Sequence, residues 1–248
     1  GGTSVPTIAY VNEDLDELKV EMPMFGSKIV MLACPREVAL RKNDKVDFFT
    51  SDRVVLRSPA RLSGYEDASS ATFRLRPEEG AKLTLLESDA QSVKRHEDGS
   101  CTVRVRRVKP GKAQAFPYKG EDKVARGALK PNRVLQSEDK RVVALARKAV
   151  GDAKNAAEAA RRIEKFVRSY VRTKNLQVGY ATAAEVAVSR QGDCSEHAVL
   201  AAAMCRAVGI PAQVVTGVLY VDRFAGREQI FGPHAWFRVY VGGKWMDL

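Results

Sequence analysis

The stretch of sequence that decides the fold reads Gly192-Asp193-Cys194-Ser195-Glu196-His197-Ala198. Asp193 is a good N-cap residue, and apolar residues follow it at helical spacing, so the stretch predicts the start of a helix. Cys194 then lies in the first turn, where free N–H groups and the helix dipole favour a thiolate. We therefore expect a lowered pKa for this thiol and interpret Cys194 as a nucleophile.

A thiolate nucleophile needs a base and a group that orients the base. Residues 231–241 are predicted to form a strand with His234 near its start, and Gly242-Gly243 is typical of a hairpin turn. Residues 244–247 begin the return strand, which carries Asp247. His234 and Asp247 are thus expected on adjacent antiparallel strands, which indicates a Cys-His-Asp triad.

Four separated motifs resemble those of the transglutaminase-like superfamily in its bacterial branch. They are Gly192 to Ala198, Gly209-Ile210-Pro211-Ala212, His234-Ala235-Trp236 and Trp245-Met246-Asp247. The resemblance covers roughly residues 132–248 and implies a papain-like α+β core, with the nucleophile at a helix N-terminus packed on an antiparallel sheet. It implies Cys194 as nucleophile, His234 as base and Asp247 as orienting residue. Bacterial members often carry an N-terminal β-domain, which the first half of this chain resembles.

The chain departs from the animal enzymes of this superfamily in its tryptophans. Animal transglutaminases place an oxyanion-holding Trp upstream of the cysteine, whereas Trp236 and Trp245 both lie downstream of Cys194. We expect the Cys194 backbone N–H to bind the oxyanion, with the side chain of Gln191 or Tyr180 as a second donor. The acidic clusters that bind calcium in animal enzymes are not evident, so neither a metal nor a cofactor is expected.

Three further residues, Asp193, His197 and Trp236, are expected to support the triad. His197 lies three residues after Cys194 on the same helix face, which makes it an alternative base. Glu196 is interpreted as an exposed or supporting carboxylate. The chain ends one residue after Asp247, where family members continue, so we expect a truncated C-terminus or a sheet that finishes differently.

The rest of the chain divides into a strand-rich half and a helix-rich half. A helix is predicted after Ser137 and ends at Gly151, a second starts with Asp152 as its cap, and a short third covers 183–189. The valines and arginines of the strand at 102–106 should point to opposite faces. The predicted strands of the first half are 28–32, 46–49, 53–56, 71–75, 82–86 and 101–108, with a hairpin turn at 96–99.

Length and charge set the domain expectation. The 248 residues favour two domains, a β-sandwich-like one with a basic connector over 1–131 and a catalytic core over 132–248. The net charge of +11 is concentrated between residues 101 and 141, which hold 12 basic and 4 acidic side chains. Such a segment suits an acidic partner, but nucleic acid is unlikely because no nucleic-acid-reading motif is present. No apolar run reaches the roughly 18 residues of a membrane span.

The four cysteines show no metal-binding spacing. Cys205 lies mid-helix among apolar residues and is assigned to the core. Cys34 and Cys101 could form a disulfide in an oxidising compartment, and the sequence leaves both that pairing and the compartment open, between cell envelope and cytoplasm.

The predicted function is attack on a peptide or amide carbonyl, with a thioester acyl-enzyme, most simply ending in hydrolysis. One alternative is transfer of the acyl group to an amine, which would cross-link proteins, because the same triad serves both reactions. A second alternative is a non-catalytic binding module on the same fold. The expected partner is a peptide or protein substrate, with an amine as the alternative acceptor.

Overall fold

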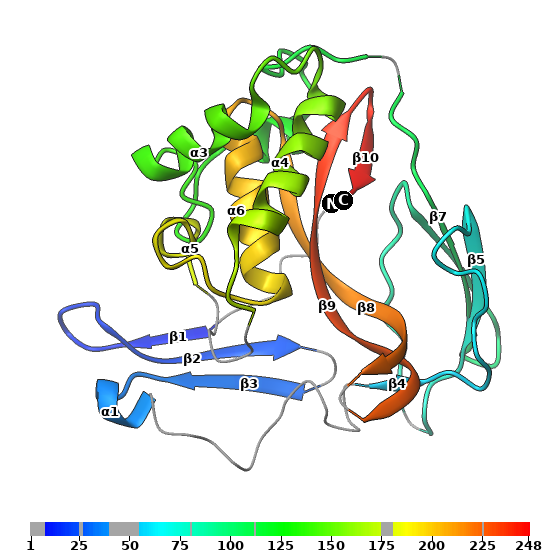
Figure 1. Cartoon of the computed structure of the whole chain (residues 1–248). Helices are drawn as coiled ribbons and strands as arrows, with labels where there is room; N and C mark the ends of the chain where they lie inside the picture. Colours follow the sequence, from blue (N-terminus) through cyan, green and yellow to red (C-terminus); the bar gives the residue numbers. More distant parts are fainter. Residues whose placement is uncertain are drawn as a thin grey trace. The chain divides into compact units, whose positions relative to one another are not determined.

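The computed structural model describes residues 8–24, 27–39, 55–79, 81–111, 113–174, 181–224 and 226–248. The chain is an α+β protein with antiparallel sheets (Figure 1). It forms two compact units, one of residues 1–61 with 218–233 and one of residues 62–217 with 234–248. The predicted domain boundary near residue 131 remains a prediction.

The first unit contains the antiparallel sheet β1 (Ile8–Val11), β2 (Glu17–Met24) and β3 (Ser27–Leu32), followed by helix α1 (Arg36–Ala39). The strand predicted at 28–32 is confirmed as β3, whereas β1 and β2 were not predicted. The short strand β4 (Leu56–Arg57) pairs with β9, so that Leu56 lies opposite Phe231. The strand predicted at 46–49 and the first two residues of the one predicted at 53–56 lie outside the described residues.

In the second unit, β5 (Ser70–Leu75), β6 (Gln91–Arg95) and β7 (Cys101–Arg106) form an antiparallel sheet in the order β5-β7-β6. The strands predicted at 71–75 and 101–108 are confirmed, and the one predicted at 82–86 is wrong. The turn at 96–99 explains the error, because a tight hairpin pairs the strands that flank it directly, here β6 and β7. On β7, Val103 is buried and Arg104 exposed, as the alternation predicts, although Val105 stays 38% exposed.

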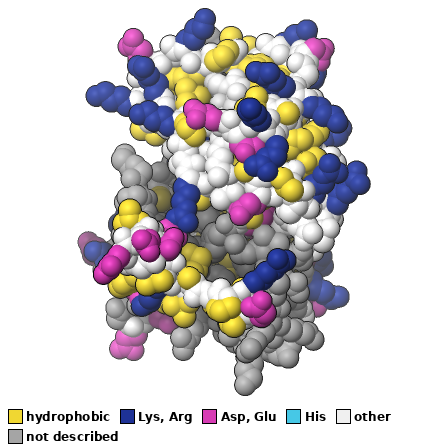
Figure 2. All heavy atoms as spheres, turned by 90° about the vertical axis from the view of Figure 1, so that its left-hand side faces the viewer, with side chains coloured by type: hydrophobic (Ala, Val, Ile, Leu, Met, Phe, Trp, Pro, Cys, Tyr) yellow, Lys and Arg dark blue, Asp and Glu magenta, His cyan; other side chains and the backbone are white. Residues whose placement is uncertain are grey.

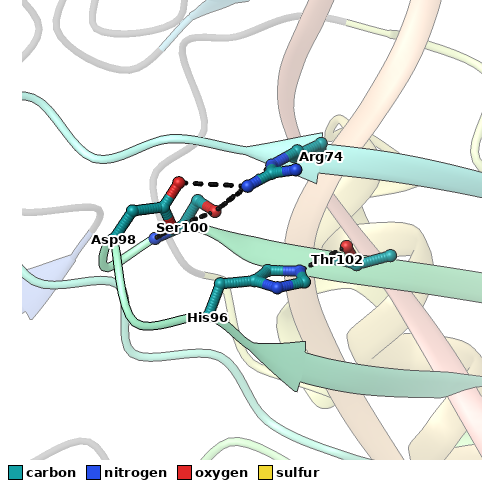
Figure 3. Close-up of polar contacts among 5 residues, drawn as sticks. All are labelled: Arg74, His96, Asp98, Ser100 and Thr102. Atoms are coloured by element: carbon teal, nitrogen blue, oxygen red, sulfur yellow. Dashed lines mark hydrogen bonds and ion pairs between the residues drawn. The ribbon is translucent and has the colours of Figure 1, made fainter.

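Polar side chains close this hairpin (Figure 3). The Asp98 carboxylate accepts hydrogen bonds from the Ser100 N–H at 3.0 Å and the Ser100 hydroxyl at 2.6 Å. Arg74 of β5 donates to both Asp98 and Ser100, and His96 Nε2 lies 2.8 Å from Thr102 Oγ1. The Ser100 hydroxyl, with its N–H and Arg74, lowers the pKa of Asp98 to about 2. The cluster therefore fixes the register of three neighbouring strands.

The core of the second unit is helical. Helices α3 (Lys140–Val150), α4 (Ala156–Tyr170) and α5 (Ala183–Ser189) surround α6 (Cys194–Ala207), and α2 (Lys123–Gly127) precedes them. Residues 198–205 of α6 are all apolar and buried, as expected for a helix covered on every side. The helix predicted at 183–189 is confirmed. The predicted cap Asp152 is wrong, because Asn155 caps α4 and Asp152 pairs with Arg162 instead.

The chain ends in strands β8 (Ala212–Phe224), β9 (Arg227–Val241) and β10 (Lys244–Asp247). Alternate residues of β9 join the helical core: Ala235, Phe237, Val239 and Val241 are buried. The residues between them, including His234 and Trp236, therefore belong to the opposite side of the strand. Within the described part of the chain, no helix is long and apolar enough to cross a membrane.

Candidate active site

The turn that precedes α6 holds Cys194 as the first helical residue. The Asp193 carboxylate accepts from the Ser195 N–H at 2.8 Å, and the Glu196 carboxylate accepts from the Asp193 N–H at 2.9 Å. These reciprocal bonds form a capping box and confirm Asp193 as the N-cap. Gly192 has a φ of +144°, and a Cβ there would lie 2.3 Å from the Glu196 Cβ, so only glycine fits.

Glu196 is the supporting residue that sequence reasoning underrated. Its side chain is fully buried and also accepts hydrogen bonds from the Ser195 hydroxyl at 3.1 Å and the Ala181 N–H at 3.2 Å. Burial raises the pKa of Glu196, while the Asp193 N–H opposes that rise. The carboxylate therefore ties the nucleophile turn to the segment before α5. The Asp-x-x-Glu spacing, a capping-box signature, is the sequence signal for this role.

The environment of Cys194 raises the pKa of its thiol. Burial is the largest cause, and the neighbouring Asp193 carboxylate acts in the same direction. A hydrogen bond from the Ala235 N–H to the sulfur lowers the pKa but does not outweigh burial. The prediction of a lowered pKa for Cys194 is therefore wrong for the free protein. Burial of the sulfur destabilises the thiolate by more than the helix N-terminus stabilises it.

His234 lies on β9 directly before Ala235, the residue whose N–H reaches the Cys194 sulfur. The structure therefore places Cys194, the predicted nucleophile, next to the backbone of Ala235, which follows the predicted base His234. Burial lowers the pKa of His234, and the negative charge of Asp193 partly opposes this. The two shifts favour a neutral Cys194 thiol and a neutral His234 imidazole in the free protein.

The Asp247 carboxylate is hydrogen-bonded to the side chain of Trp236. The register of β10 places Asp247 opposite Arg238, four residues along β9 from His234 and so about 13 Å away along the strand. Trp236 Nε1 donates to the Asp247 carboxylate at 2.9 Å, and the Trp236 ring stacks on the His234 ring with centroids 6.3 Å apart. The indole thus lies between the carboxylate and the imidazole. Its supporting role was predicted, but its place between the two was not.

The Trp236 ring also depends on a glycine in β8. A Cβ at Gly217 would lie 2.7 Å from Trp236 Cη2, so the small residue leaves room for the indole.

The remaining predicted residues lie as follows. His197 Nδ1 is hydrogen-bonded to the Asp193 carbonyl oxygen, which fixes the ring to its own helix and leaves Nε2 without a proton in the neutral form. Gln191 is exposed and pairs with Thr173 through the backbone, next to Gly192. Tyr180 lies outside the described residues. Cys205 is fully buried, which raises its pKa, and all four cysteines are free.

Comparison with known proteins identifies the second half of the chain. A sequence profile described as the Transglutaminase-like superfamily matches residues 143–248. This match covers less than half of the chain and shows a likeness of that part to the superfamily. No curated protein matches the chain.

Solved structures resemble the chain at low sequence identity. One is a candidate cysteine protease from Cytophaga hutchinsonii, with a TM-score of 0.50 and 20% identity over 73% of this chain and 71% of that one. Another is the periplasmic domain of TgpA from Pseudomonas aeruginosa bound to ethylmercury, with a TM-score of 0.48 and 16% identity over 72% and 70%. The first likeness shows a shared fold, in agreement with the predicted α+β class.

The pKa of His234 gives the transglutaminase-like core a testable pH dependence. The role of general base predicted for His234 requires a neutral imidazole, so kcat/KM should rise with pH through the pKa of His234, which lies below the ordinary 6.5. We expect the acid limb of kcat/KM below pH 6.5. Asp193→Asn keeps a good N-cap but removes the charge that raises this pKa, so it should move the limb to still lower pH. A limb above pH 6.5, or an upward shift in Asp193→Asn, would contradict this assignment.

Proposed function

We propose that residues 132–248 form a cysteine enzyme that attacks peptide or amide carbonyls, with Cys194 as nucleophile and His234 as general base. One observation carries the proposal: the backbone of Ala235, the residue that follows His234, lies close enough to the Cys194 sulfur at the start of α6 to lower the pKa of the thiol. Nucleophile and base thus come from a helix end and a strand that meet at one point. Such rigid placement is what covalent catalysis by a cysteine needs.

Two supporting roles complete the proposal. Asp247 acts as the orienting carboxylate through Trp236, whose indole it holds against the His234 ring. The Cys194 N–H is one of the free N–H groups at the start of α6 and serves as an oxyanion donor. Gln191 and Tyr180 remain the proposed candidates for the second donor.

The proposed reaction has two stages. The Cys194 sulfur bonds to the carbonyl carbon as its proton moves to His234, and the oxyanion forms at the donors. The C–N bond then breaks, His234 returns the proton to the leaving amine, and a thioester remains. In the second stage, a water attacks the thioester carbon and gives a proton to His234, which passes it to the leaving sulfur. The products are an amine and a carboxylic acid.

Hydrolysis is favoured over transfer to an amine. Cys194 and His234 are only half-buried and Asp247 is exposed, so water can reach the thioester. Amine transfer requires a site that shields the acyl group from water. Cross-linking therefore stands as the alternative outcome of the same chemistry.

A peptide library incubated with the protein, with and without a labelled primary amine, tests the proposal by mass spectrometry. We expect cleaved or deamidated peptides carrying a new carboxylate, equal in yield with and without the amine. Incorporation of the amine at the expense of acid would favour acyl transfer instead. No change in any peptide, with the protein folded, would favour the non-catalytic binding module.

A further inference from the structure

Helix α4 carries a line of exposed cations on the side opposite its core-facing residues. Four residues form it, at helical spacings of four, three and four, and we call it the α4 basic track: Arg161, Lys165, Arg168 and Arg172. This spacing places Arg161, Lys165 and Arg168 on one face of α4. Arg172 follows the helix, after the extended residue Val171. All four are exposed. In Figure 2, Lys and Arg side chains are scattered over the face and the edge of the upper part of the view.

Among the described residues, no carboxylate pairs with the track, although Glu164 lies on the same helix between Arg161 and Arg168. Asp152 and Glu158 both pair with Arg162, each at 2.7 Å, beside the track. Across the described residues, none of the four track cations forms an ion pair. Like charges three or four residues apart destabilise a helix by about 0.2–0.5 kcal/mol a pair. Glu164, four residues before Arg168, and the helix dipole, which favours cations in the last turn, offset part of this repulsion.

The track leads to the proposed nucleophile. The Arg172 N–H donates to the Arg190 carbonyl at 3.0 Å, and the Gly192 N–H donates to the Thr173 carbonyl at 3.0 Å. Thr173 also pairs with Gln191 in a parallel bridge. The end of the track is therefore joined to the turn that carries Cys194. In Figure 1, α4 runs down to the end of the helical bundle at which α6 begins.

The dimensions suit an extended peptide. The ten helical residues from Arg161 to Tyr170 span about 14 Å and Arg172 lies two residues beyond the helix, so about five extended residues would match the track. At its far end the track borders a shallow hollow of about 500 Å³, lined by Pro110, Ala157, Arg161 and Lys165, among others. Arg162 and Glu158, which pair with each other, also line the hollow, so Arg161 and Lys165 are its unpaired cations among the described residues and suit a chain with acidic side chains.

We propose that the α4 basic track binds an acidic stretch of a polypeptide substrate and directs the neighbouring amide bond to Cys194. This inference rests on the proposed function and adds the substrate class to it. A membrane surface fits less well, because helices that bind one insert an apolar face, and the apolar face of α4 is buried in the core. A nucleic acid offers no amide in a chain to the nucleophile that the track adjoins.

Two peptides test the proposal. They share one cleavable centre, flanked on both sides by five Glu in one peptide and five Gln in the other. We expect kcat/KM to be about tenfold higher for the Glu peptide at low salt, through KM, and the ratio to shrink with added salt. The variant Arg161→Glu/Lys165→Glu/Arg168→Glu should bring the ratio to one or below. The matched control Lys140→Glu/Arg147→Glu/Lys148→Glu, which changes as many exposed cations on α3, should keep it.

Binding separates this inference from the proposed function. Fluorescence anisotropy with the Glu peptide and the protein carrying Cys194→Ala needs no turnover. Tighter binding of Glu than Gln peptide, lost in the track variant alone, supports the track even if no amide is cleaved. Equal binding of both peptides, equal loss in the α3 control, or tighter binding to anionic vesicles or DNA than to the Glu peptide would overturn it.

Discussion

Replacing Cys194 by Ala is expected to lower kcat for an amide substrate on the order of 10⁴-fold or more, because no other group can form the thioester. The described residues offer no substitute at this point: Ser195 is engaged with Asp193 and Glu196, and Cys205 is fully buried. Turnover is measured with the purified variant, and circular dichroism checks that it is folded. Substrate affinity should change little, because the sulfur contributes to the reaction and not to docking.

The matched control for this prediction is Cys205→Ala, on the same helix. Cys205 is buried in the core and has no proposed part in the reaction, so this variant should keep its turnover at a modest cost in stability. His234→Gln should lose about as much activity as Cys194→Ala, and the double variant should lose no more, because residues that act as one unit are not additive. Full activity in Cys194→Ala would rule out the proposed reaction.

The second large effect is expected on stability. Glu196→Ala removes a fully buried carboxylate that accepts hydrogen bonds from the part-buried Asp193 and Ala181 N–H groups. Each unsatisfied buried group costs about 1–3 kcal/mol, so we expect the free energy of unfolding to fall by about 3–5 kcal/mol. Urea denaturation followed by fluorescence measures the change. Activity should fall with it, because the same carboxylate holds the turn that carries Cys194.

Glu185→Ala is the matched control, because Glu185 closes the capping box of α5. Its carboxylate accepts from the Thr182 N–H at 2.8 Å, but the side chain is exposed and water replaces it. A loss of about 0.5–1 kcal/mol is expected there. If Glu196→Ala does not fold, Glu196→Gln can be measured instead; its amide keeps one acceptor, so it should lose about 1–3 kcal/mol. Equal losses at Glu196 and Glu185 would contradict the buried role of Glu196.

The local elements of the site could be predicted because each has its own signal in the sequence. Asp193 before an apolar run fixes the start of α6, and Gly242-Gly243 between two strands fixes the β9–β10 hairpin. The cap of α4 was misplaced because Asp152 and Asn155 are both good caps. Only the three-dimensional pairing of Asp152 with Arg162 decides for Asn155.

The features that depend on burial and register could not be predicted. The shift in the pKa of Cys194 is set by loss of solvent, which a helix position does not reveal. The indole of Trp236 between Asp247 and His234 follows from the register of β10 on β9, whereas the sequence predicted only that Asp247 and His234 lie on adjacent strands. The sequence likewise could not show that Asp152 and Glu158 pair with Arg162 and not with the cations of the α4 basic track.

The central claim is that Cys194 forms a covalent acyl-enzyme. The direct measurement is mass spectrometry of the protein quenched in acid during turnover of an activated amide or ester substrate, followed by digestion and peptide mapping. We predict a mass increase equal to the acyl group on the peptide that contains Cys194, absent in Cys194→Ala and removed by hydroxylamine. An acyl group on any other residue, or turnover with no acylated Cys194 at any time point, would contradict the account.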